Sequence, residues 1–292
     1  MKKDVVCILG MGRVGSAVGC LLRKSGYEIA AVASRSKSSA ERGAFYTGAR
    51  AFTRFSDAAS LADCILITTS DDAIASVCNS ISAEGGVRPG KKVIHMSGAG
   101  GLDLLESARK AGAYVASIHP IQSFADIKGG IENIPGSTFG ITADKEILSW
   151  SVRFVRELGG KPLLVPEEDK PLYHAAACMA SNYLVALMYI VEEIYAAFGL
   201  NSSEALEAFW PLVKGTIRNI ESSGTVQSLT GPISRGDIGT VVKHIGTFQK
   251  RMPSVLEVYR ILGKFTAEIG IAKGTLSPEK AETLKKLLQG GS

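Results

Sequence analysis

Three glycines near the start of the chain form the motif with the clearest chemistry. Gly10, Gly12 and Gly15 have the spacing G-x-G-x-x-G, follow the apolar run 4–9 and precede the helix-like segment 16–23. In such a strand–turn–helix unit the first glycine permits a tight turn, the second lets the backbone approach a pyrophosphate, and the third lets the helix pack against the sheet. The free N–H groups at the helix start would face the phosphates. The predicted dinucleotide contacts are Gly10, Met11, Gly12, Arg13, Val14 and Gly15.

The end of the second apolar run, residues 28–34, indicates which dinucleotide to expect. NAD-binding folds usually place an acidic residue there to accept hydrogen bonds from the ribose hydroxyls. This chain has Ser34, Arg35 and Ser36 instead. Hydroxyl groups and a guanidinium that donates two parallel hydrogen bonds suit a 2′-phosphate. We therefore expect NADP rather than NAD, the alternative being that Arg35 is a solvated loop cation.

Polar side chains also follow the third and fourth apolar runs, at positions where open parallel sheets bind ligands. Thr69 and Ser70 lie at the end of the third run, and we expect them beside the cofactor. Ser97 follows the fourth run. Its hydroxyl would hydrogen-bond to a substrate oxygen or to the nicotinamide ribose, and the alternative is a serine that only shapes a turn.

Histidine is well suited to exchange a proton near neutral pH, which the reduction of a carbonyl group requires. Of the four histidines, His119 follows the fifth apolar run and His174 begins a long apolar helix that would line a cleft. Both are therefore catalytic candidates, the alternatives being a loop-packing histidine and a satisfied core histidine. His95 lies inside a strand and His244 on an amphipathic helix, so both are interpreted as structural.

Four further polar residues complete the predicted site. Gln122 and Ser123 follow His119 and would orient a substrate. Asn182 lies in an apolar helix, where a buried amide without a partner costs ~1–3 kcal/mol. It would hold the substrate or the nicotinamide amide, or else satisfy a backbone group. Arg235, in a glycine-flanked loop, would bind a substrate carboxylate, the alternative being a surface ion pair.

The elements that must position these residues alternate between strand-like and helix-like segments in the first half of the chain. This alternation predicts a doubly wound α/β domain with a mostly parallel sheet, residues 1–166. Helical patterns alone follow the polar stretch 166–171 and predict an all-α domain, residues 167–292. The expected strands are 4–10, 28–34, 63–69, 92–96, 113–118, 138–142 and 159–166. The expected helices of the second domain are 172–198, 202–220, 238–250, 253–269 and one that begins near residue 277.

One apolar stretch is long enough to raise the question of a membrane span. Residues 171–191 carry no formal charge, and about 20 apolar residues cross a bilayer. However, His174, Ser181 and Asn182 lie within its first twelve residues, and two glutamates follow it directly. We therefore interpret the stretch as a buried central helix and expect no membrane association.

Composition limits the classes of partner. The net charge of +5 is spread along 292 residues, which suits an anionic small molecule. Trp150 and Trp210 are not embedded in Lys/Arg clusters, so the basic, aromatic-lined face of a nucleic-acid binder is not expected. The five cysteines are scattered and lack a C-x-x-C pair, which argues against a metal site and favours reduced thiols in a cytoplasmic protein. An apolar strand begins almost at once, so no signal peptide is expected.

Three further motifs carry a family resemblance. They are the residues HPIQSF at 119–124, the helical segment 173–183 and the loop GPISRGD at 231–237. With the glycine motif and the helical second domain, they make the chain resemble one branch of the 6-phosphogluconate-dehydrogenase-like superfamily. That branch comprises Rossmann-like NADP oxidoreductases whose helical domain was long of unknown function, and some members resemble an alternative type of ketopantoate reductase. The resemblance implies NADP-dependent reduction of a small 2-oxo acid in an interdomain cleft, and a homodimer built by the helical domain.

The chain departs from better-known relatives at the first interdomain helix. Hydroxyisobutyrate-type enzymes and ordinary ketopantoate reductases place a lysine four residues before an asparagine. Here Cys178 stands four residues before Asn182, and His174 lies about two helical turns before it. A proton donor on this helix is therefore expected to be His174, with Lys170 as a weaker candidate.

Other functions remain open at this point. The His119–Pro120 pair is similar to the corresponding context in prephenate or arogenate dehydrogenases, and imine reductases of the pyrroline-5-carboxylate type belong to the same superfamily. A non-catalytic, NADP-binding regulatory protein is the alternative of a different class, because a fold alone does not establish activity. Such a protein would bind NADP without consuming it and would tolerate the loss of His119 or His174.

Overall fold

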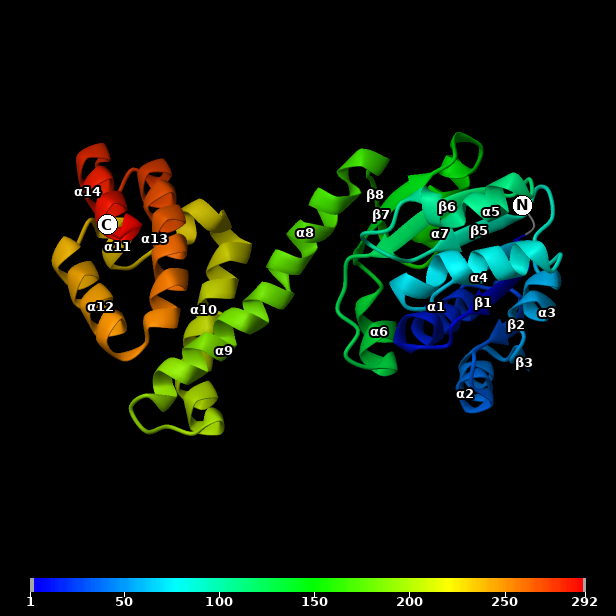
Figure 1. Ribbon diagram of the computed structural model, residues 1–292, viewed down its shortest axis with the longest axis horizontal. Coiled ribbons are helices and arrows are strands. Elements are labelled where there is room, and N and C mark those ends of the chain that lie inside the picture. Colours follow the sequence, from blue (N-terminus) through cyan, green and yellow to red (C-terminus); the bar gives the residue numbers. More distant parts are fainter. Residues whose placement is uncertain (1–2, 291–292) are drawn as a thin grey trace. The chain divides into compact units, whose positions relative to one another are not determined.

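The computed structural model describes residues 3–290, which form two compact units that divide between Leu184 and Val185 (Figure 1). All strands among the described residues lie in the first unit, and the second is helical. The sequence placed the domain boundary at 166/167. Helix α8 (Lys170–Ala180), which follows that point, belongs to the first unit because Lys170 and Tyr173 hydrogen-bond to the sheet.

The first unit is built on an eight-stranded sheet in the order β3-β2-β1-β4-β5-β6-β7-β8. Neighbouring strands are parallel except for β6 and β7, which are antiparallel. Because β2 and β4 flank β1, the strand order reverses there, which is where open α/β sheets bind ligands. The predicted doubly wound, mostly parallel α/β fold is thus confirmed. The strands are β1 (Val6–Leu9), β2 (Ile29–Ala33), β3 (Arg50–Phe52), β4 (Cys64–Ile67), β5 (Lys92–His95), β6 (Tyr114–Pro120), β7 (Thr138–Ala143) and β8 (Lys161–Leu164).

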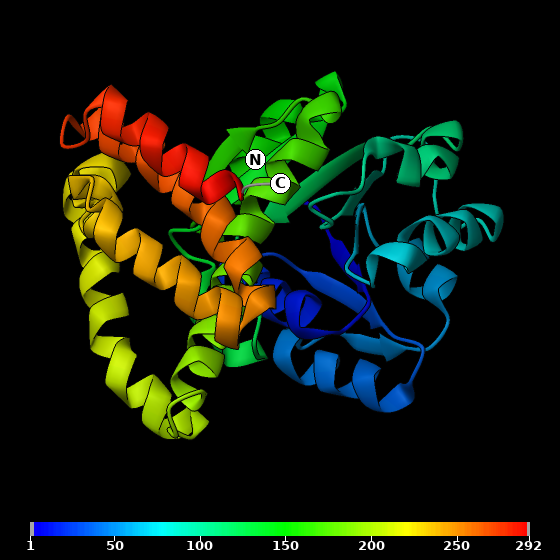
Figure 2. The same ribbon diagram turned by 60° about the vertical axis from the view of Figure 1, so that its left-hand side comes forward.

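Helices cover both faces of this sheet (Figures 1 and 2). Successive side chains of a strand point to opposite faces, so Ile8 packs in one core with Leu22 and Phe154, while Leu9 packs in the other with Ile74. Burial on both faces explains why the strands read as continuous apolar runs. On the Ile8 side lie α1 (Arg13–Lys24), α2 (Lys37–Thr47), α6 (Ile127–Asn133) and α7 (Leu148–Glu157). On the Leu9 side lie α3 (Phe55–Ser60), α4 (Asp71–Ala83) and α5 (Glu106–Lys110).

Short elements escaped the sequence analysis. Strand β3 has three residues, pairs with β2 at the edge of the sheet and leaves two of its side chains exposed. It therefore gives no apolar run by which a strand is recognised. Three short 3₁₀ helices also connect larger elements; they are η1 (Leu102–Leu105), η2 (Lys145–Ile147) and η3 (Glu167–Asp169).

The second unit confirms the predicted helical region. Its core contains Ile233, Val241, Ala267 and Leu284. The helix expected over 172–198 is divided at Ser181, where φ is −116° and ψ is −67°, into α8 and α9. The remaining helices are α9 (Asn182–Ala196), α10 (Ser202–Ser228), α11 (Pro232–Arg235), α12 (Ile238–Arg251), α13 (Pro253–Lys273) and α14 (Pro278–Gln289).

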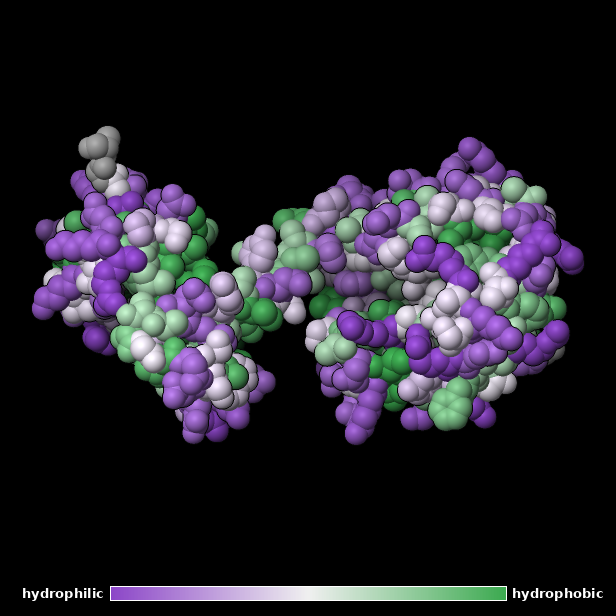
Figure 3. Space-filling model, turned by 60° about the horizontal axis from the view of Figure 1, so that its bottom comes forward, coloured by the Kyte–Doolittle hydropathy of each residue, from purple (hydrophilic) through white to green (hydrophobic). Residues whose placement is uncertain are grey.

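The apolar stretch 171–191 is not buried within the chain, so the prediction of a buried central helix is wrong. Leu172, Met179 and Val185 are 74%, 63% and 68% exposed. Apolar side chains on a helix are more stable when they are shielded from water. The sequence of the helix does not show whether its own chain or another molecule shields them. The helical stretch Glu167–Ala196 is also long and apolar enough to cross a membrane. Figure 3 shows apolar side chains among hydrophilic ones on the visible surface of each unit.

Candidate functional site

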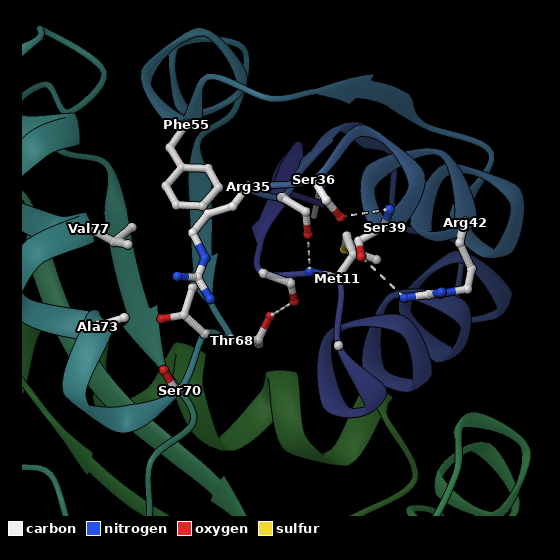
Figure 4. A pocket seen from close by; sticks show the side chains of 14 residues that line it. Met11, Arg35, Ser36, Ser39, Arg42, Phe55, Thr68, Ser70, Ala73 and Val77 are labelled. Atoms are coloured by element: carbon white, nitrogen blue, oxygen red, sulfur yellow. Dashed lines mark hydrogen bonds between the residues drawn. The ribbon is translucent and has the colours of Figure 1, made fainter.

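A cavity of about 610 Å³ lies at the carboxyl ends of β1, β2 and β4 (Figure 4). The strand order explains it, because β2 and β4 flank β1 and bring three loops that are distant in sequence to one place. The lining residues are Gly10, Met11, Gly12, Ser34, Arg35, Ser36, Ser39, Arg42, Phe55, Thr68, Thr69, Ser70, Ala73 and Val77. Most of the residues predicted to bind the cofactor therefore meet in one cavity.

The glycine turn has a geometric reason at each position. Gly10 has a φ of +106°, and a Cβ there would lie 2.7 Å from the backbone nitrogen of Thr69. A Cβ on Gly15 would lie 2.3 Å from the carbonyl oxygen of Gly10, so helix α1 packs directly against the strand end. A Cβ on Gly12 meets no heavy atom within 4 Å, so this position leaves open space beside the cavity. The contacts of Gly10 and Gly15 match the turn and packing roles expected from the sequence, whereas the approach of Gly12 to a pyrophosphate stays a prediction.

The substitution Gly15→Ala should lower the free energy of unfolding by about 2 kcal/mol, because the added methyl group collides with backbone that cannot move easily. Gly12→Ala is the matched control: it adds the same group to the same turn, where space is open, and should change stability by less than about 0.5 kcal/mol. Urea unfolding of both variants measures the difference. Equal losses of stability would contradict this account of the turn.

Hydrogen bonds hold the loops around the cavity in place. The Oγ of Ser34 accepts a hydrogen bond from the backbone N–H of Met11 at 2.9 Å, and the Oγ1 of Thr68 donates to the carbonyl oxygen of Gly10 at 2.7 Å. In contrast, the Oγ1 of Thr69 is buried and has no partner among the described residues. A buried hydroxyl without a partner costs ~1–3 kcal/mol, so this atom is free to bind a ligand at low cost.

Two arginines and two serines of the cavity lining form a group that we call the phosphate corner: Arg35, Ser36, Ser39 and Arg42. The Oγ of Ser36 accepts from the N–H of Ser39 and thereby caps α2, and an Nη of Arg42 donates to the Oγ of Ser39 at 3.3 Å. Figure 4 shows Arg35 beside the ring of Phe55 and Arg42 on the far side of Ser39. Both guanidinium groups are available to an anion.

Three of the predicted cofactor contacts lie outside the cavity lining: Arg13, Val14 and Gly15. Val14 packs against the buried core of the first unit. Arg13 reaches in the other direction, where an Nη donates to the carbonyl oxygen of Phe124 at 3.4 Å. Their backbone N–H groups still belong to the first turn of α1, which begins at Arg13 and which Gly12 cannot cap with a side chain.

A second cluster lies at the carboxyl ends of β5 and β6, where His119 and His174 meet. Their ring centroids are 5.8 Å apart. A Cβ on Gly98 would lie 2.4 Å from the Nδ1 of His174 and 2.9 Å from the Nε2 of His119. Glycine at position 98 therefore leaves room for both imidazoles. The structure thus brings together the two histidines that the sequence indicated separately.

His119 is held against the sheet by Tyr173. The hydroxyl of Tyr173 lies 2.9 Å from the Nδ1 of His119, and the two rings meet edge to face. Burial, together with the nearby His174 and Lys170, lowers the pKa of His119 to about 4. His119 is therefore neutral at neutral pH. A neutral imidazole serves as a hydrogen-bond donor to a substrate oxygen rather than as a source of a proton.

His174 has one occupied nitrogen and one open nitrogen. Its Nε2 lies 3.5 Å from the Sγ of Cys178, one turn later in α8. Its Nδ1 is buried and has no hydrogen-bond partner within the described part of the chain. This nitrogen is the position in the cluster at which a ligand atom would gain a hydrogen bond and at which a proton would be exchanged.

A chain of hydrogen bonds connects α8 with the sheet next to the histidines. The Nζ of Lys170 donates to the Oγ of Ser117 at 2.7 Å, and that hydroxyl donates to the carbonyl oxygen of Ser97 at 3.1 Å. The Oγ of Ser97 donates a hydrogen bond to a carboxylate oxygen of Asp71 at 2.7 Å, so the proton of this hydroxyl is used within the protein. Burial lowers the pKa of the Lys170 ammonium to about 8.

His95 has the structural role expected for it. Its Nδ1 accepts from the N–H of Ser97 at 3.1 Å, and its Nε2 lies 3.0 Å from the carbonyl oxygen of Gly101. Both nitrogens are therefore occupied. Burial lowers the pKa of His95 to about 4, so this ring is also neutral at neutral pH.

Gln122 and Ser123 of the first unit make no hydrogen bond to the two histidines among the described residues. The side-chain amide of Gln122 donates to the Oγ of Ser137 at 3.1 Å and to the carbonyl oxygen of Asn133, so it organises its own loop. Ser123 and Asn182 are exposed. Arg235 is exposed at the end of α11, in the second unit.

Sequence reasoning missed the roles of Tyr173, Gly98 and Arg42. Tyr173 belonged to a recognised motif, but only the fold shows that its hydroxyl reaches a strand 54 positions earlier. The importance of Gly98 depends on two side chains from other elements. Arg42 carried a usable signal, because it follows Ser39 by three residues, a spacing that places two side chains on the same side of a helix.

Comparisons with known proteins agree with this description. Residues 2–120 match a Rossmann-like domain, and residues 137–266 match a domain of unknown function, DUF2520. No curated protein matches the chain. A protein from Thermotoga maritima has a similar structure, with 27% identity, a TM-score of 0.73, and coverage of 92% of this chain and 99% of that one.

Two further solved structures share the fold. A candidate NADP oxidoreductase from Bacteroides fragilis is 19% identical, with a TM-score of 0.73 and coverage of 91% of this chain and 98% of that one. A pyrroline-5-carboxylate reductase from Coxiella burnetii is 16% identical, with a TM-score of 0.60 and coverage of 98% of this chain and 99% of that one. The chain therefore joins a Rossmann-like domain to a region that matches DUF2520, in a fold that it shares with oxidoreductases.

Proposed function

We propose that this protein is an NADP-dependent oxidoreductase that reduces a C=O or C=N group of a small, carboxylate-bearing substrate. The observation that carries the proposal is that two sites lie on one edge of one sheet. The carboxyl ends of β1, β2 and β4 form a cavity with a phosphate corner, and those of β5 and β6 carry the two histidines. From β2 to β6 the sheet spans four strand spacings, about 19 Å, which suits an extended dinucleotide.

The residues of the cavity fit NADP. The open side of Gly12 and the uncapped start of α1 would receive the pyrophosphate, and the unpartnered hydroxyl of Thr69 would bind nearby. Arg35 and Arg42 would bind the 2′-phosphate, because no acidic side chain lines the cavity among the described residues. The similarity to a candidate NADP oxidoreductase and to a pyrroline-5-carboxylate reductase supports this assignment.

The two histidines would divide the work of the reaction. A bound nicotinamide supplies the hydride. His119, neutral and held by Tyr173, would donate a hydrogen bond from its Nε2 to the substrate oxygen or nitrogen and stabilise the charge that develops there. His174 would deliver the proton from its Nδ1, which faces the same space over Gly98.

We propose a 2-oxo acid similar to ketopantoate as the first substrate to test, because the sequence motifs resemble those of an alternative type of ketopantoate reductase. A cyclic imine acid is the second, because a pyrroline-5-carboxylate reductase shares the fold over nearly the whole chain. Arg235 remains our candidate for binding the substrate carboxylate.

Oxidation of NADPH, followed by its absorbance, tests the proposal on a panel of 2-oxo acids and cyclic imine acids. We expect turnover with at least one of the two groups. Tight NADPH binding without turnover on either group would contradict an oxidoreductase and favour the non-catalytic, regulatory alternative.

We also propose that a second copy of the chain covers the exposed apolar side chains of α8 and α9. A lipid cover suits α8 poorly, because Lys170 and Tyr173 of this helix hydrogen-bond to strand β6. The exposed side chains continue into α9, where Val185 and Tyr189 are 68% and 61% exposed. Apolar patches of this kind are typical of protein interfaces.

The wild-type protein should therefore have a mass of twice 30.8 kDa by light scattering after gel filtration. Replacing both Val185 and Tyr189 with aspartate should give the 30.8-kDa monomer, because two buried charges would have no partners in the interface. Phe45→Asp is the matched control, since Phe45 is 82% exposed on α2, and it should remain dimeric. A monomeric wild type would contradict the dimer.

A further inference from the structure

The environment of Tyr173 defines the direction of its hydrogen bond to His119. The phenol is half-buried, and burial raises its pKa to about 12, so its hydroxyl keeps its proton. Strand β7 pairs with β6 so that Gly140 lies opposite His119, and a Cβ on Gly140 would be 2.4 Å from the Tyr173 oxygen. Only glycine therefore lets the phenol reach this point of the sheet.

The Tyr173 hydroxyl has one proton and two possible acceptors among the described residues. They are the Nδ1 of His119, at 2.9 Å, and the carbonyl oxygen of His119, at 3.4 Å. The shorter distance is that of a good hydrogen bond and the longer one is not. The Nδ1 of His119 is thus the acceptor.

The remaining ring proton of His119 then lies on Nε2. A neutral imidazole has one N–H, and an Nδ1 that accepts a hydrogen bond leaves that N–H at the other nitrogen. Nε2 faces the space over Gly98, into which the unpartnered Nδ1 of His174 also points. The Nε2–H of His119 and the open Nδ1 of His174 therefore face the same space, where a substrate group would bind.

We propose that Tyr173 is a positioning residue that fixes the tautomer of His119, so that Nε2–H faces the reacting group and Nδ1 does not. The role of Nε2–H in the reaction rests on the proposed function, whereas the tautomer itself does not. Tyr173 also fixes the orientation of the ring, because the alternative ring flip would turn Nδ1 away from the phenol. The hydroxyl acts only through His119 and is not assigned any contact with the substrate.

The ¹⁵N NMR spectrum of the imidazole nitrogens tests the tautomer without a substrate. The chain has four histidines, so each signal pair is assigned by one His→Gln variant. In the wild-type protein at pH 7 we expect His119 to show an unprotonated, hydrogen-bonded Nδ1 and a protonated Nε2. In Tyr173→Phe the Nδ1 signal should move to the position of an imidazole nitrogen without a donor, and the protonated fraction of Nε2 should fall.

Two controls separate this effect from a loss of structure. The His95 nitrogens are held by Ser97 and Gly101, so an unchanged His95 signal shows that Tyr173→Phe is folded. Tyr183→Phe removes a hydroxyl from an exposed tyrosine and should leave His119 unchanged. If Tyr173→Phe does not fold, the wild-type spectrum alone shows which nitrogen of His119 carries the proton.

A wild-type His119 that is protonated on Nδ1 would overturn the proposal, as would an unchanged Nδ1 signal in folded Tyr173→Phe. If the protein also reduces a substrate, Tyr173→Phe should lower kcat about tenfold with little change in KM, because one neutral hydrogen bond is lost. The predicted tautomer with no turnover on any substrate would count against the proposed function and leave the assignment of Tyr173 intact.

Discussion

Replacing His119 with asparagine should lower kcat by about 10²–10³-fold and leave the affinity for NADPH unchanged. Asparagine places an amide where Nδ1 stands and keeps the contact with Tyr173, but it has no group at the position of Nε2. The expected loss is that of one preorganised donor to a developing negative charge. NADPH binding is preserved because His119 does not line the cavity.

His119→Gln is the matched variant, because the glutamine side chain reaches the position of Nε2 and can donate a hydrogen bond there. It should retain more activity than His119→Asn. His244→Gln, which changes a histidine of α12 bonded to Tyr259, should have no effect on kcat. If both His119 variants were fully active, His119 would not act in the reaction.

The low pKa of His119 limits the part that this residue can play in the pH dependence of the reaction rate. Because burial holds that pKa near 4, His119 is neutral both at pH 6 and at pH 8. Any change of kcat/KM between these pH values must then come from another group. The profile of His119→Gln should therefore keep the wild-type shape above pH 6.

Replacing Arg35 and Arg42 together with alanine should weaken NADPH binding by about 100-fold and leave NADH binding unchanged. Each guanidinium would contribute a charge-assisted interaction with the 2′-phosphate, worth about 1.4 kcal/mol or tenfold at a solvent-exposed site. NADH lacks that phosphate and gains nothing from the phosphate corner. Isothermal titration calorimetry with both nucleotides measures the two affinities.

Each single arginine variant should lose about tenfold in its affinity for NADPH. The two single variants show whether Arg42 binds the 2′-phosphate together with Arg35. Arg153→Ala removes an exposed arginine from α7, outside the cavity, and should bind NADPH like the wild type. Equal losses of NADPH and NADH affinity would show that the arginines bind a part common to both nucleotides. The assignment of a phosphate corner would then be wrong.

The sequence predicted the sheet and the glycine turn because their signals are local. A strand buried on both faces reads as an apolar run, and the glycine motif occupies six consecutive positions. The sequence also identified Ser34 and Arg35 as residues near the glycine turn. They stand at the end of the second apolar run, whose distance along the chain from the first apolar run is typical of this fold. Strand β3 was missed because its three edge residues are too few and too exposed to give a pattern.

The histidine cluster depends on contacts between distant segments, which a single sequence does not contain. His119, Gly98 and His174 come from three elements, and only the docking of α8 on β6 brings them together. The burial of the apolar stretch was predicted wrongly for a related reason. The stretch has the composition of a buried helix, but Leu172 and Val185 are exposed in the chain because composition does not specify which molecule covers a surface.

The most direct test of the central claim is the thermal stability of the wild-type protein with NADPH and, separately, with NADH. A ligand that binds only the folded state stabilises it by about 2.7 kcal/mol at 100 times its Kd. We expect NADPH to raise the Tm by several degrees and NADH, at the same concentration, to raise it much less. No shift with NADPH, or a larger shift with NADH, would contradict the assignment of the cavity as an NADP site.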